Sequence, residues 1–278
     1  MGTEEKKEEL KHSLSMFNKY KDLLMELTRK NVKLKYRNSW LGIFWSFLQP
    51  LLNMIVLSVI FGALLARKKD GIVCYPVYLF SGRLIFEFFV TSTKQSLTAF
   101  RRNASIIKKV YVPKYLYPLS TIIYNYILFL LSLIILAALA IVYRVPTSWH
   151  IIEIFIPLII LFILCVAVGL ILSTVCVFFR DLEYLWEVIV MLIMYCSAIF
   201  YNIERIGAAK IILKFNPLYC IISNVRCVVM EGGSIFTSTS FDLSNLSMML
   251  YSLGFSLVAL VIGVVMFKKN QDKFILHI

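Results

Sequence analysis

Long runs of residues without a formal charge recur along this chain and constrain its fold more than any other feature. The first run extends from Asn38 to Ala66. At 1.5 Å per helical residue, such a run crosses the roughly 30 Å hydrocarbon layer of a membrane. Residues that suit the membrane interface precede or begin it, namely Lys35, Arg37, Trp40 and Trp45. We expect a spanning helix here, kinked at Pro50, which cannot donate to the helical ladder.

Together with this first run, further apolar runs predict six spans, at 40–66, 75–97, 116–143, 151–179, 184–201 and 248–267. The composition, 60% hydrophobic and 16% charged, is too apolar for an ordinary soluble domain. The expected fold class is therefore an all-α integral membrane protein. Its transmembrane domain covers residues 40–268, and a short tail follows at 269–278.

The basic residues indicate orientation. The formal net charge is +13, but Lys and Arg gather at the ends of apolar runs instead of alternating with an aromatic platform, so we expect no nucleic-acid partner. Most of them precede Trp40 or lie between Lys94 and Lys114, which predicts that both termini are cytoplasmic. The cluster from Arg67 to Lys69 would lie outside and is the exception. Polar residues precede the first run, so no cleavable signal is expected.

Residues 1–39 form the predicted cytoplasmic N-terminus. Apolar residues Phe17, Tyr20, Leu23, Leu24 and Leu27 recur at helical spacing opposite a charged face. This pattern predicts an amphipathic helix that lies in the headgroup plane. A solvated helix packed on a partner is the alternative.

Two segments between the spans are too short or too interrupted to cross lipid. Residues 99–113 are basic around a short apolar centre and predict a cytoplasmic loop with a short helix. Residues 204–231 are apolar but interrupted by Lys210, Lys214, the Asn216–Pro217 pair and Arg226. We expect a re-entrant helical hairpin on the outer side before the last span, because non-helical backbone at membrane depth needs protein or water around it.

Arg83 and Glu87 lie four residues apart within the second predicted span. Ionisable residues at membrane depth face protein or water and often pair. A structural intrahelical pair and a role in the conducting path both fit this spacing.

Catalytic and metal-binding motifs are missing from the sequence. No GxxxxGK[ST], HExxH or GxSxG occurs, and Cys and His show no metal-ligand spacing. We therefore predict no catalytic residue, no metal site and no cofactor on this chain. A pore or a pathway fits these features better than an active site.

Five segments resemble a known family. They are YRNSWLGIFWSFLQPLLN from Tyr36, LFSG from Leu79, NASIIKKVYVPKYLYP from Asn103, FFRDLEYLW from Phe178 and NPLYCIISNVR from Asn216. In this order they resemble the membrane subunit of bacterial ABC exporters for polysaccharides, which include O-antigen, capsule and wall teichoic acid permeases. The resemblance covers about residues 14–270.

The resemblance implies a homodimer in the bacterial cytoplasmic membrane that moves a lipid-linked glycan outward. It implies two copies of a separate P-loop ATPase subunit, which hold the ATP and Mg. The segment near Ala99–Lys109 would be the coupling helix, and the turn Arg180–Glu183 a second contact. The coupling residues are then Arg101, Ser105, Ile106, Ile107, Lys108, Lys109, Arg180 and Asp181. We expect joint replacement of Ile106, Ile107 and Lys108 to uncouple transport.

The transport path has further candidates. Aromatic rings stack on the C–H faces of sugars, so Trp45, Tyr195, Phe200 and Tyr201 join Arg83 and Glu87 as candidates that line the path. Ordinary interfacial or core roles also fit each aromatic residue. A lipid diphosphate would need cations such as Lys35, Arg37 and Arg101, although orientation alone explains them. Lys210, Lys214 and Arg226 slightly favour an anionic polymer.

Three other classes compete with this interpretation. A drug or lipid ABC exporter shares the coupling architecture. A membrane enzyme acting on lipid-linked sugars would need converging acids. A secondary transporter predicts internal repeats, of which we find none convincing.

Overall fold

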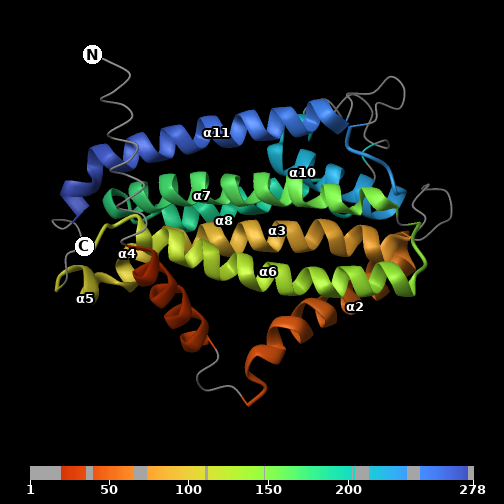
Figure 1. Ribbon diagram of the computed structural model, residues 1–278, viewed down its shortest axis with the longest axis horizontal. Coiled ribbons are helices and arrows are strands. Elements are labelled where there is room, and N and C mark those ends of the chain that lie inside the picture. The colour runs from red at the N-terminus through yellow and green to blue at the C-terminus, as the bar shows by residue number, and fades with distance from the viewer. Residues whose placement is uncertain are drawn as a thin grey trace.

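The computed structural model describes residues 20–35, 40–65, 74–109, 112–146, 148–201, 203, 213–236 and 245–274. Long helices make up most of this part of the chain; all but the first of them run side by side, and the first slants away from the bundle (Figure 1). They are α2 (Trp45–Leu65), α3 (Tyr75–Leu97), α6 (Leu116–Val142), α7 (Phe155–Phe178), α8 (Leu182–Tyr195) and α11 (Asn245–Asn270). Shorter elements are η1 (Gly42–Phe44), α4 (Ala99–Arg102), α5 (Ala104–Ile107), η3 (Trp149–Ile154), α10 (Pro217–Arg226), η5 (Cys227–Glu231) and η6 (Gln271–Lys273).

Helix α7 lies at the centre of the bundle and packs against α3, α6 and α11. Its buried side chains are almost all apolar, and its close contact with α11 depends on a glycine. A Cβ atom at Gly263 would lie 3.0 Å from the carbonyl oxygen of Ala167. Small residues at such crossings let helix backbones approach closely, as is typical of helices in membranes.

Three helical segments within the described residues are long and apolar enough to cross a membrane. They are Leu116–Val142, Trp149–Phe178 and Asn245–Lys273. Helix α3 carries Arg83, Glu87 and Lys94, and α8 has 14 residues, about 21 Å of helix. The chain is thus an all-helical, multi-pass membrane protein, and the crossings of α2, α3 and α8 stay predictions.

Helix α8 departs from the predicted range of 184–201. It ends at Tyr195, and residues 196–201 form a turn in which Ala198 has a φ of 45°. Hydrogen bonds from other helices hold this turn, as described below, and a pattern of apolar residues does not reveal them. Helix α8 thus ends six residues before Tyr201, the predicted end of the fifth span.

The predicted hairpin falls partly outside the described residues. Its second half contains α10, which begins at a favourable signal: the Asn216 side chain accepts a hydrogen bond from the Leu218 N–H at 3.0 Å, and Pro217 follows. Helix α10 packs against α3, α7 and α11, and most of its side chains are buried. Its depth in a membrane stays a prediction.

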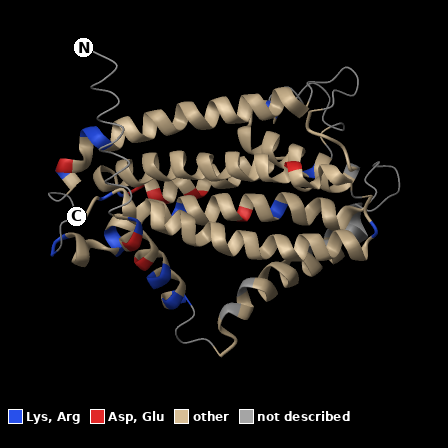
Figure 2. Ribbon diagram, viewed as in Figure 1, with Lys and Arg blue, Asp and Glu red and all other residues tan. Residues whose placement is uncertain are grey.

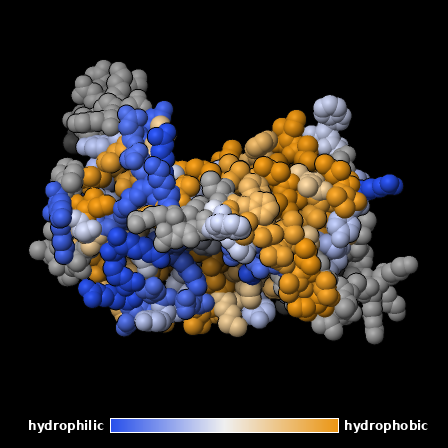
Figure 3. All heavy atoms as spheres, turned by 90° about the horizontal axis from the view of Figure 1, so that it is seen from below, coloured by the Kyte–Doolittle hydropathy of each residue, from blue (hydrophilic) through white to orange (hydrophobic). Residues whose placement is uncertain are grey.

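Charge divides the molecule along its length. Helices α4 and α5 and the C-terminal end of α11 lie at one end of the bundle, and α10 lies toward the other (Figure 1). Lys and Arg gather at the end that holds α4 and α5 (Figure 2). Seen from below, this end is hydrophilic, whereas much of the remaining face is hydrophobic (Figure 3). We call the end with α4 and α5 the basic end.

Candidate functional site

The two segments predicted to contact an ATPase lie together at the basic end. Arg101 of α4 pairs with Glu183 at the start of α8, with 2.5 Å between Nη2 and Oε2. The hydrogen bond to Glu183 raises the pKa of the Arg101 guanidinium. Beside it, Lys94 of α3 pairs with Glu187 of α8 at 3.0 Å. Arg101 and Glu183 are 82 residues apart in the chain, and with the neighbouring pair they form one charged surface.

An apolar cluster supports this surface from within. It consists of Leu24, Leu27, Ala99, Phe100, Ile107, Leu116, Tyr117, Leu170, Phe267 and Phe274, and we call it the coupling-end cluster. The Phe274 ring centroid lies 5.0 Å from that of Phe100 and 5.4 Å from that of Phe267. Lys114 donates a hydrogen bond to the carbonyl oxygen of Gln271. The start of the predicted tail is thus packed against α4.

The helix over 20–35 also contacts this cluster. Its Leu24 and Leu27 side chains are buried, whereas Lys21, Asp22 and Arg29 are exposed, as the amphipathic pattern predicts. The Lys30 ammonium donates to the Asn103 side-chain oxygen at 3.2 Å, in the turn between α4 and α5. The apolar face of this helix therefore packs against the chain itself.

The predicted coupling residues differ in exposure. Six are exposed and available to a partner: Arg101, Ser105, Lys108, Lys109, Arg180 and Asp181. Ile106 is half-buried, and Ile107 belongs to the coupling-end cluster with 9% of its surface exposed. Ile107 thus supports from within the surface on which an ATPase is predicted to dock, which we call the coupling surface. Its replacement would disturb the folding of this end of the molecule.

A polar cleft lies between α2, α3 and α6. Its polar lining comes from Lys35, Gln49, Glu87, Thr91, Asn125 and Ser132, and its volume is about 80 Å³. A smaller pocket continues it between α2 and α3, past Asn53, Arg83 and Glu87. Because a cavity that holds one water needs about 10–15 Å³ of such volume, the cleft has room for several waters.

Arg83 and Glu87 are only loosely paired in this cleft. Arg83 Nε lies 4.0 Å from Glu87 Oε2, and each side chain is about one-third exposed. The Arg83 Nη1 atom approaches the Met194 sulfur, a weak acceptor, at 3.8 Å. The long distance and partial exposure indicate a weak ion pair.

The predicted aromatic residues lie elsewhere. Phe200 and Tyr201 belong to the turn after α8, which α3 binds through its tyrosines. Tyr75 donates to the Phe200 carbonyl at 3.1 Å, and Tyr78 to the Tyr201 carbonyl at 2.8 Å. Tyr195 is exposed at the end of α8. These three residues form a group separate from the cleft that holds Arg83 and Glu87.

The sequence places Arg226 among three basic residues that slightly favour an anionic polymer, but its position in the structure does not support that role. Its side chain is buried, and its guanidinium donates to the carbonyls of Ala198 at 3.0 Å, Ile199 at 3.1 Å and Tyr78 at 3.2 Å. Its Cζ atom lies 3.5 Å from the Tyr78 ring centroid. Arg226 therefore fixes the turn after α8 to α3 and cannot contact a glycan.

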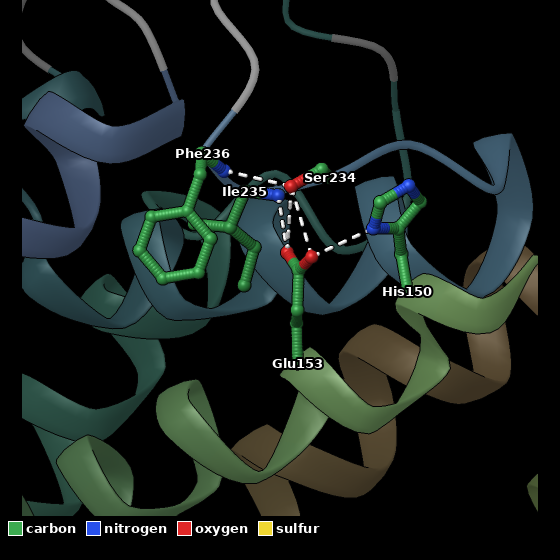
Figure 4. A network of polar contacts seen from close by, with 5 residues as sticks. All are labelled: His150, Glu153, Ser234, Ile235 and Phe236. Carbon is green, nitrogen blue, oxygen red and sulfur yellow. Dashed lines mark hydrogen bonds and ion pairs between the residues drawn. The ribbon is translucent and has the colours of Figure 1, made fainter.

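A carboxylate anchors the segment after η5. Glu153 of η3 accepts hydrogen bonds from the Ile235 N–H at 2.7 Å and from the Ser234 hydroxyl at 2.9 and 3.0 Å (Figure 4). His150 Nδ1 lies 2.7 Å from Glu153 Oε1. This network joins the entrance of α7 to residues 234–236, far from the basic end.

Of the remaining predicted site residues, some line the cleft, some do not, and some lie outside the described residues. Lys35 lines the cleft, with its ammonium 5.9 Å from the Tyr124 ring centroid. Trp45 is exposed at the start of α2 and does not line the described pockets. Arg37, Lys210 and part of the predicted hairpin lie outside the described residues. In the part of the chain that the structure describes, His, Cys, Asp and Glu form no group of three or more that could hold a metal ion.

Sequence reasoning missed several residues of these sites. Gln49 and Asn125 line the cleft, and Phe274 completes the coupling-end cluster. A search for amides within apolar runs would have found the first two, since such residues in spans face protein or water. Phe274 has no comparable signal.

Comparison with known proteins identifies the family of the chain. The model of the ABC-2 type transporter family matches residues 22–230. The chain belongs to this family. The match extends from the helix over 20–35 through α10 to η5 and so includes the coupling surface and the cleft. Members of the ABC-2 family are transporter subunits, which agrees with a transport role for this chain.

Relatives within the ABC-2 family carry more specific names. An O-antigen export system permease protein of Klebsiella pneumoniae is 32% identical over 260 residues, which cover 91% of this chain and 93% of the relative. One from Myxococcus xanthus is 27% identical over 76% of this chain and 82% of the relative. A polysialic acid transport protein of Escherichia coli is 25% identical over 93% of this chain and 97% of the relative.

Proposed function

We propose that this chain is the permease subunit of an ABC transporter that exports a polysaccharide and is driven by a separate ATPase subunit. The observation that carries the proposal is the 32% identity to an O-antigen permease over 93% of that relative. The polysialic acid relative adds a capsule-type polymer to the same class. Both names describe polymers of sugars, so a polysaccharide is the cargo best supported here.

The coupling mechanism that we propose is mechanical. An ATPase would dock on the exposed residues of α4, α5 and the turn at 180–181. Its movement would reach α8 through the Arg101–Glu183 pair, and α6, α7 and α11 through the coupling-end cluster. Because packed cores and interfaces switch between discrete arrangements, a shift of α4 would separate α2 from α3 and α6. No covalent step falls on this chain.

The finer features of the proposal come from the resemblance and the charge pattern. We propose a homodimer of six-span subunits in the bacterial cytoplasmic membrane, with both termini cytoplasmic and a lipid-linked glycan as cargo. Lys35 would attract the lipid diphosphate at the entrance of the cleft, and Arg83 and Glu87 would contact the passing sugar. Because the Arg226 side chain is buried, it cannot favour an anionic polymer such as teichoic acid, and that preference is weaker.

Exposed coupling residues provide the test. Ser105, Lys108 and Lys109 replaced together by Ala should abolish glycan export while leaving membrane insertion intact, because none of them supports the coupling-end cluster. This set is better than the Ile106, Ile107 and Lys108 set, since Ile107 is buried. Arg144→Ala, an exposed cation at the opposite end, is the control. Export at the wild-type level in the triple variant would overturn the proposed coupling surface.

A further inference from the structure

An apolar groove lies at the basic end, between α6 and α11 on the surface of α7. Its volume is about 410 Å³. The floor is formed by Val166 and Leu170 of α7, and the walls by Leu119, Ile122, Val264 and Phe267. Helices α6 and α11 each pack on α7 and leave this space between them. No step of the proposed transport mechanism uses it.

The lining of the groove becomes polar at its end toward η6. Tyr115, Lys268 and Gln271 form the rest of its lining there, and no carboxylate belongs to the lining. A phenol, an ammonium and a carboxamide are all hydrogen-bond donors. The groove therefore offers apolar walls for a hydrocarbon chain and donors at one end for an anionic head.

We propose that this groove binds one acyl chain of an anionic phospholipid, with its phosphate at Lys268. The helices α6, α7 and α11 are the three that are long and apolar enough to span a membrane, so a groove between them opens toward lipid. Basic pockets between transmembrane helices near the cytoplasmic surface bind anionic headgroups. Leu170 and Phe267 belong to both the groove and the coupling-end cluster, so the bound lipid would support the coupling surface.

The chain offers matched variants for a test. Val264→Trp places an indole in the groove, and Val265→Trp makes the same change at the next residue, which does not line it. Lys268→Gln removes the cation at the mouth, and Lys269→Gln removes an equal charge beside it. Binding is measured by native mass spectrometry of the full-length chain in detergent, titrated with phosphatidylglycerol, phosphatidylcholine or undecaprenyl phosphate.

We expect one phosphatidylglycerol to bind the wild-type chain roughly fivefold more tightly than phosphatidylcholine, as one nearby lysine would produce. Lys268→Gln should abolish this preference and Lys269→Gln should keep it. Val264→Trp should weaken binding of both phospholipids and Val265→Trp should not. If Val264→Trp fails to fold, the two lysine variants alone test whether the phosphate lies at Lys268.

Three results would overturn the proposal. Equal losses in the two lysine variants would indicate diffuse attraction to a basic surface. Wild-type binding by a folded Val264→Trp variant would place the lipid elsewhere. Tighter binding of undecaprenyl phosphate than of phosphatidylglycerol would assign the groove to the carrier lipid. The test uses binding alone, so it does not depend on what the chain transports.

Discussion

Arg101 and Glu183 form an ion pair that joins α4 to α8, although α6 and α7 separate them in the chain. The pair connects the two segments that the sequence predicts as contacts for an ATPase. Both side chains are more than one-third exposed, so the pair contributes only about 0–1 kcal/mol to folding. In the proposed mechanism, the pair links the movement of one segment to that of the other.

Reversing the charge of one partner should therefore impair transport more than folding. Arg101→Glu is expected to lower glycan export several-fold with little change in the apparent unfolding temperature. The double variant Arg101→Glu with Glu183→Arg should regain part of the export, because it restores an attractive pair. Export assays in cells that produce equal amounts of each variant check this. No recovery in the double variant would mean that Arg101 acts through the partner alone.

Gly82 should tolerate no side chain. A Cβ atom there would lie 2.5 Å from Arg226 Nη2, which hydrogen bonds to carbonyls hold in place. Gly82→Ala is expected to destabilise the chain by about 1–3 kcal/mol. Gly254→Ala, where a Cβ meets open space, should be neutral or more stable by up to ~1 kcal/mol. Equal unfolding temperatures of the two variants in detergent would refute the packing described for Arg226.

Replacing Glu87 tests whether the cleft takes part in transport. Glu87→Gln should lower export several-fold but shift the apparent unfolding temperature by no more than roughly 2–4 °C, because the Arg83 pair is long and partly exposed. The double variant Arg83→Gln with Glu87→Gln separates the two roles left open by the sequence. If the pair were only structural, removing both charges would restore export. We expect export to stay low.

Glu153 should contribute to stability far from the coupling surface. Glu153→Gln removes charge-assisted hydrogen bonds to Ser234 and Ile235 and is expected to cost about 1.5–3 kcal/mol. Glu187→Gln, at a carboxylate whose side chain is 60% exposed, should cost about 0–1 kcal/mol. The difference is measurable as an unfolding temperature in detergent. A larger loss in the Glu187 variant would contradict the network in Figure 4.

Much of the fold was accessible from sequence because apolar runs and basic clusters are local signals. They predict the long helices, and they place α4, α5 and the turn before α8 on one side of the molecule. The end of α8 was not predictable, since no Gly, Pro or charge marks Tyr195. Hydrogen bonds from Tyr75, Tyr78 and Arg226 determine that turn, and all three come from distant parts of the chain.

The candidate site was predictable to a smaller extent. The basic composition of residues 99–113 predicts that the charged coupling residues are exposed. The burial of Ile107 and Phe274 depends on tertiary packing, which the periodicity of so short a segment does not predict. Arg226 shows the converse error. A cation in an apolar segment was interpreted as a ligand-binding group, whereas it satisfies backbone carbonyls of a turn.

The central claim is that this chain moves a polysaccharide only when an outside ATPase drives it. The most direct measurement reconstitutes the chain into vesicles with and without its ATPase partner and follows transfer of the lipid-linked glycan across the bilayer. We predict transfer only when the partner and hydrolysable ATP are both present. Transfer of the same rate by the chain alone, or without ATP, would contradict the account.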